Sequence, residues 1–90
     1  MNIEDVFSSK LRIKILKLLM QMGELNISEI VRRLRVNYNI VNGHLKVLED
    51  EGIIQHKVFG RIRLYKLNES SSKAKAVYSL IETWEKIDRL

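Results

Sequence analysis

The residue types that support catalysis or metal binding are scarce in this sequence. It has no cysteine and two histidines, His44 and His56. Disulfides and thiolate metal sites are therefore excluded, and neither histidine has a second one at ligand spacing. There is no glycine-rich phosphate loop and no carboxylate pair framed by an evident pocket. We predict no enzyme, catalytic residue, metal or cofactor, and interpret His44 as a packed helix residue.

The stretch VNYNIVNGHLKVLEDEG, residues 36–52, carries side chains suited to recognition instead of catalysis. Asn42-Gly43 would mark a hairpin turn if alternating apolar residues flanked it. The residues after it do not alternate, and Val41, Leu45 and Leu48 follow a helical period. The hairpin interpretation is therefore rejected in favour of a helix over 38–51, which follows Asn37 as its N-cap and ends before a C-cap at Gly52.

The poor helix formers of this predicted helix fall on its exposed face. Asparagine can pair with adenine, and tyrosine and lysine can reach bases or phosphates in the major groove. A glycine there either allows close approach of the backbone to a duplex or has no function. The candidates for base reading are Tyr38, Asn39, Asn42, Gly43 and Lys46.

The positive charge is concentrated in the middle of the chain. The net charge is +5, and residues 32–66 contain the whole excess of basic over acidic side chains. This predicts either a polyanionic partner or simply a solvated basic surface. The candidates for contacts to a DNA backbone are Arg32, Arg33, Arg35, Asn37, Lys57, Arg61 and Arg63.

The periodicity of apolar residues predicts the elements that would position these side chains. A first helix follows Ser8 or Ser9 and ends at Gly23, after a short lead-in turn that packs on the same core. A second helix of about two turns follows Asn26, which forms a capping-box-like pair with Glu29. Residues 54–67 alternate as two strands with Gly60-Arg61 at their tip. The predicted apolar faces are Ile3, Val6 and Phe7 in the lead-in turn, Leu11, Ile15, Leu18, Leu19 and Met22 in the first helix, and Ile27, Ile30, Val31 and Leu34 in the second helix.

A last helix is predicted over 73–90. Its apolar residues are spaced by threes and fours, and they either fold back on the domain or form a dimer interface. The three preceding helices already supply a core, which favours the homodimer. The candidate interface residues are Val77, Leu80, Ile81, Trp84 and Ile87.

Four segments together resemble the ArsR-like winged-helix transcriptional regulators, within the broader MarR-like group: SSKLRIKILKLL, ELNISEIVRRL, NGHLKVLEDEGII and GRIRLYKL. The resemblance covers roughly residues 7–68 and departs from the family at Gly43, where a polar or basic residue is common. It implies a mainly α, winged-helix fold, with a DNA-binding domain over 1–68 and a dimerisation element over 69–90. The five candidate base-reading residues would occupy its DNA-reading positions.

The resemblance implies a homodimer that binds double-stranded DNA sequence-specifically and regulates transcription. A non-specific architectural nucleic-acid binder and a protein-interaction module remain alternatives. The acidic N-terminus without an apolar segment after it, and the absence of a run of about 20 apolar residues, predict a cytoplasmic, DNA-associated protein without a membrane partner. The composition is also compatible with an archaeal source.

Overall fold

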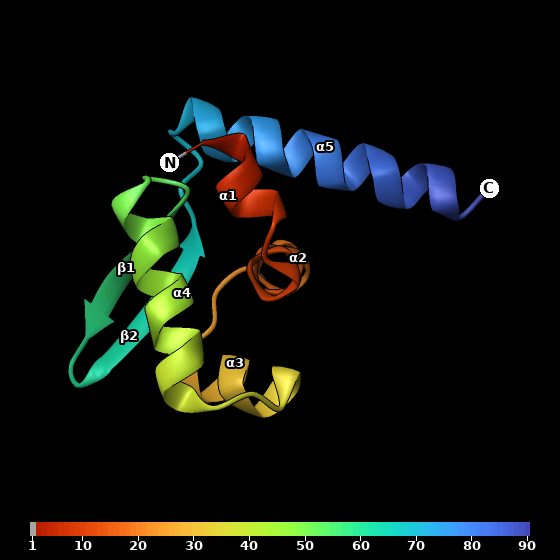
Figure 1. Cartoon of the computed structure of the whole chain (residues 1–90). Helices are drawn as coiled ribbons and strands as arrows, with labels where there is room; N and C mark the ends of the chain where they lie inside the picture. Colours follow the sequence, from red (N-terminus) through yellow and green to blue (C-terminus); the bar gives the residue numbers. More distant parts are fainter. Residues whose placement is uncertain (1) are drawn as a thin grey trace.

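The computed structural model describes residues 2–90; residue 1, the first of the predicted DNA-binding domain, lies outside them. Within these residues, five helices and a two-stranded hairpin follow one another (Figure 1). The elements are α1 (Ile3–Phe7), α2 (Lys10–Met22), α3 (Ile27–Leu34), α4 (Tyr38–Asp50), β1 (Ile54–Phe59), β2 (Ile62–Leu67) and α5 (Ser72–Asp88). The predicted mainly α, winged-helix class is confirmed.

The helix ends follow local rules that the sequence displays. The Ser9 hydroxyl accepts from the Arg12 amide at 3.2 Å at the start of α2. Asn26 and Glu29 form the predicted capping box, with hydrogen bonds of 2.9 and 3.1 Å. The Asn37 side chain caps α4 by accepting from the Asn39 amide at 2.7 Å. These bonds satisfy backbone amides that have no partner inside a helix.

The two strands pair as a regular antiparallel hairpin. Ile54 pairs with Leu67 at its base and Phe59 with Ile62 at its tip, as expected for a turn at Gly60-Arg61. Leu25 adds an isolated antiparallel bridge to Tyr65, so a very short extended segment lies between α2 and α3.

The core lies where α2, α3, α4 and the base of the hairpin meet. Its fully buried residues include the three predicted anchors of α4, so this helix is fixed firmly on the domain. The largest fully buried side chains are Ile15, Leu16, Leu19, Ile30, Val41, Leu45, Leu48, Ile53 and Ile54.

Two expectations about this core were wrong. Met22 was placed on the buried face of α2, but it is exposed at the helix end, while Leu16 is fully buried. Because α2 packs against several elements, it buries more than one stripe. In the lead-in segment only Val6 is buried; Ile3 and Phe7 are exposed.

Helix α5 extends across the domain, and its C-terminal end lies away from the hairpin (Figure 1). The predicted apolar stripe on this helix is divided. Ile81 is buried and Val77 is partly buried against the core of the same chain, whereas Leu80, Trp84 and Ile87 are exposed. The division of the chain into domains near residue 68 stays a prediction.

Candidate nucleic-acid interface

The exposed surface of α4 brings four of the predicted base-reading side chains together. Val41, Leu45 and Leu48 turn one face of α4 into the core. The opposite and flanking surface is exposed. It carries the polar side chains of Tyr38, Asn39, Asn42 and Lys46, with the apolar side chain of Ile40 exposed among them.

Gly43 lies on the same exposed surface and has no role inside the protein. A Cβ built on it would meet no heavy atom within 4 Å, and its backbone is not in the left-handed region. Glycine is less favourable than alanine in a helix by about 1 kcal/mol. Nothing within residues 2–90 offsets this unfavourable free energy.

Two side-chain contacts fix α4 relative to its neighbours. The Arg12 Nε donates to Nδ1 of His44 at 3.1 Å, and an Arg12 guanidinium nitrogen donates to the backbone carbonyl of Asp5 at 2.7 Å. At the other end of α4, Glu49 Oε2 lies 2.6 Å from Nδ1 of His56 in β1. The second contact ties the end of α4 to the hairpin.

The electrostatics around His44 favour its neutral form. Burial first, and the positive charge of Arg12 second, lower the pKa of His44. A neutral imidazole with an unprotonated Nδ1 is also the form that can accept from Arg12. His44 is thus a packed residue in a polar contact between helices.

The hairpin forms a basic arm beside α4. Its strands and tip contain no acidic residue, and Lys57, Arg61 and Arg63 are exposed. Lys57 lies 3.7 Å from Glu24, so part of its charge is compensated within the domain. The positive charges of Arg61 and Arg63, near the tip, are therefore compensated less than the charge of Lys57.

The hairpin tip also carries apolar side chains that sequence reasoning did not single out. Val58, Phe59 and Ile62 are all about half exposed or more. The alternation of apolar residues predicted the two strands but did not show that the hairpin extends beyond the core. In the structure it does, and only the first residue of β1 is buried.

The connection between α3 and α4 places three arginines at the surface. Arg32 and Arg33 lie in the last turn of α3 and Arg35 is its C-cap, and all three are exposed. Basic residues also stabilise a helix C-terminus, so their positions have a structural explanation as well. Arg35 adopts a left-handed conformation with φ of 55°, and it is the one non-glycine residue with positive φ among residues 2–90.

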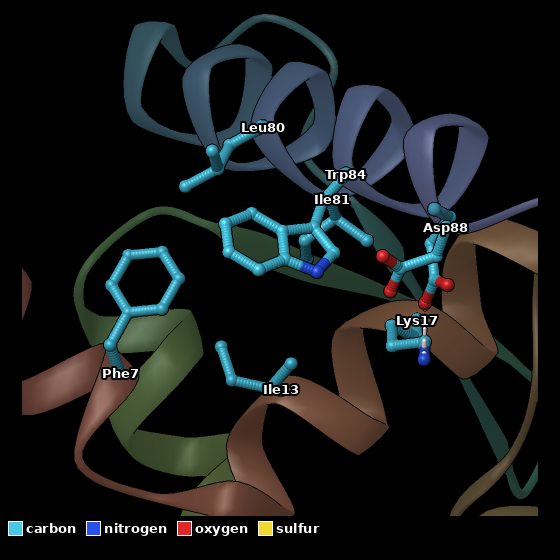
Figure 2. A pocket seen from close by; sticks show the side chains of 8 residues that line it. Phe7, Ile13, Lys17, Leu80, Ile81, Trp84 and Asp88 are labelled. Carbon is cyan, nitrogen blue, oxygen red and sulfur yellow. Dashed lines mark ion pairs between the residues drawn. The ribbon is translucent and has the colours of Figure 1, made fainter. Parts of the chain in front are cut away.

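A second surface, on the other side of the domain, is an apolar groove between α1, α2 and α5. Figure 2 shows Phe7, Ile13 and Trp84 facing its interior. The groove has a volume of about 530 Å³, and Trp84 is 64% exposed. Lys17 forms an ion pair with Glu85 at its margin.

Other kinds of site have no basis within residues 2–90. No group of three or more His, Asp or Glu side chains there could hold a metal ion. No helix of this part of the chain has the length and apolarity to cross a membrane.

Comparison with known proteins identifies the class to which this fold and surface belong. The family model described as "Bacterial regulatory protein, arsR family" matches residues 9–56, more than half of the chain. The chain therefore belongs to the ArsR family of winged-helix, DNA-binding transcriptional regulators. A search of curated protein sequences finds no match.

Solved structures support the same assignment at the level of the fold. HlyU from Vibrio cholerae is 24% identical, with a TM-score of 0.76, and the match covers 89% of this chain and 84% of HlyU. The transcriptional repressor BigR from Xylella fastidiosa is 22% identical, with a TM-score of 0.77 and coverage of 88% and 76%. The homodimeric winged helix-turn-helix domain of Mb0332 from Mycobacterium bovis is 20% identical, with a TM-score of 0.74 and coverage of 91% and 73%. These relatives give the archaeal source no support.

Proposed function

We propose that this protein is a homodimeric transcriptional regulator that binds double-stranded DNA sequence-specifically. Helix α4 enters the major groove, and the β1–β2 hairpin lies along the flanking backbone or minor groove. The observation that carries the proposal is the exposed surface of α4. Its asparagines, tyrosine and lysine stand on a helix whose opposite face is fully buried.

The chemistry of this surface suits base edges better than phosphates alone. An asparagine amide can donate and accept at once, as adenine N6 and N7 require. A purely electrostatic binder would need only cations, which read no sequence. Asn39 and Asn42 are therefore the residues to which we assign base recognition, with Tyr38 and Lys46 beside them.

The basic residues supply affinity and orientation in this proposal. Arg61 and Arg63 contact phosphates or the minor groove beside the site read by α4. Arg32, Arg33 and Arg35 are placed to contact phosphates near the start of α4. Asn37 already caps α4 with its side-chain oxygen, so its contribution is to position the helix N-terminus, which attracts phosphate.

The dimer is proposed to form through the groove between α1, α2 and α5. Leu80, Trp84 and Ile87 are exposed on α5, and a second copy would cover them. Val77 and Ile81 lie beneath this surface, because they pack on the core of their own chain. The homodimeric state named for the Mb0332 domain supports a homodimer. A two-fold dimer places its two α4 helices about 34 Å apart, one turn of DNA.

Selection from a pool of random duplex DNA tests the proposal. The purified protein is bound to the pool, and bound fragments are amplified and sequenced over several rounds. Enrichment of a symmetric motif with half-sites about 10 base pairs apart is the expected result. Recovery of unbiased sequences would favour a non-specific binder, and recovery of no DNA would favour a protein-interaction module.

A further inference from the structure

Gly43 leaves a position without a side chain on the exposed face of α4, and we call the space above it the notch. Neither its backbone conformation nor its surroundings within residues 2–90 require glycine, because a Cβ there would meet nothing within 4 Å. The absent side chain therefore leaves space on the surface. Glycine is intrinsically unfavourable in a helix, so a partner that occupies this space would give the residue its function.

The side chains around the notch differ on its two sides. On a helix, residues three and four positions apart are neighbours. Ile40 and Val47 border Gly43 on one side, and Asn39 and Lys46 border it on the other. Ile40 is 50% exposed, although it stands among polar groups. The notch thus has one apolar wall and one wall of hydrogen-bonding groups.

One base in the major groove combines these two characters. Thymine presents its C5-methyl group beside the O4 acceptor, and its adenine partner presents N7 and the N6 donor. A methyl group seated above Gly43 would contact Ile40, while Asn39 and Lys46 would face the polar atoms of the pair. An alanine at position 43 would occupy the space of the methyl group.

We infer that α4 reads an A·T base pair at this point, with the thymine methyl group against Gly43 and Ile40. Ile40 is then a further specificity-determining residue, in addition to the polar side chains. The inference rests on the proposed function, since it needs α4 to lie in the major groove.

Replacing thymine by uracil tests the inference, because it removes only the methyl group. Duplexes carrying the selected motif are prepared with uracil at each thymine in turn, symmetrically in both half-sites. Affinities are measured by fluorescence anisotropy at one fixed salt concentration. The proteins are the unaltered chain, Ile40→Ala, Gly43→Ala and the control Ile3→Ala, which shortens an exposed isoleucine on α1. Thermal unfolding confirms that each variant is folded.

The inference predicts one thymine per half-site at which uracil weakens binding about fourfold, the effect of one buried methyl group. The loss persists in Ile3→Ala and disappears in both Ile40→Ala and Gly43→Ala. The inference is overturned if no thymine methyl group matters, or if the loss persists in either α4 variant. Failure to select any motif would instead overturn the proposed function, and it would be seen before any uracil duplex is made.

Discussion

Arg12 of α2 donates a hydrogen bond from Nε to Nδ1 of His44 in α4 over 3.1 Å. The same guanidinium also donates to the backbone carbonyl of Asp5 in α1. One side chain therefore connects three helices, including the one assigned to the major groove. The contact requires an unprotonated Nδ1 on His44.

The stability of the protein should therefore fall in mild acid. Because the pKa of His44 in the folded chain lies below its ordinary value of 6.5, the unfolded chain takes up the proton first as the pH falls. The contribution is complete above pH 6.5 and is lost progressively below it, towards the folded pKa. Urea unfolding at a series of pH values from 8 to 5 measures this loss.

The matched control for this experiment is His44→Gln. Its amide oxygen can accept from Arg12 but does not titrate near neutrality. All other ionisable groups are shared by the two proteins, so the comparison isolates position 44. The difference in the free energy of unfolding between the two proteins should change below pH 6.5. Parallel pH profiles would show that the Arg12–His44 contact does not respond to protonation.

Gly43→Ala should stabilise the folded protein by about 1 kcal/mol, because alanine is the better helix former and the added methyl group meets no neighbour. Gly23→Ala is the control, since Gly23 has φ of 85° and alanine there is strained. Chemical denaturation of both variants measures the two effects. Equal destabilisation by both substitutions would mean that Gly43 serves the fold.

Arg61→Ala should weaken DNA binding on all sequences by a similar factor. Arg61 is exposed at the hairpin tip, where phosphate contacts release counterions but read no bases. The slope of log affinity against log salt should fall in magnitude by about 1. Arg89→Ala, which removes an exposed arginine after α5, is the control. An unchanged slope in Arg61→Ala would place the hairpin tip away from the DNA.

Trp84→Ala should shift the protein from dimer to monomer. The side chain is 64% exposed in the single chain, so its removal should weaken association more than folding. Sedimentation analysis of both proteins measures their mass, and Ser79→Ala, at an exposed position of α5, is the control. If the unaltered chain is monomeric at roughly tens of micromolar, the role assigned to Trp84 is wrong.

Local patterns in the sequence were sufficient to predict most of the fold. The helical period of Val41, Leu45 and Leu48 outweighed the turn signal of Asn42-Gly43, and α4 continues through that pair. Capping residues located the starts of α3 and α4, because their hydrogen bonds are made within three residues. The tip of the hairpin was predicted because the apolar residues change from a helical period to a period of two.

Features that depend on tertiary contacts were not predicted. Arg12 and His44 are 32 residues apart, and no local period connects them. The division of the α5 stripe into a buried part and an exposed part depends on the position of α5 against the domain. The left-handed conformation of Arg35 was also unexpected, because glycine or asparagine commonly occupies such a position.

The most direct test of the central claim compares specific with non-specific binding. The dissociation constants of the unaltered protein and of the Asn39→Ala/Asn42→Ala double variant are measured on the selected motif and on a scrambled duplex, at one salt concentration. For the unaltered protein we expect a ratio of about 10³ or more between the two duplexes. The double variant should lose most of this ratio while retaining its affinity for the scrambled duplex. A ratio near 1 for the unaltered protein, or an unchanged ratio in the double variant, would contradict base reading by α4.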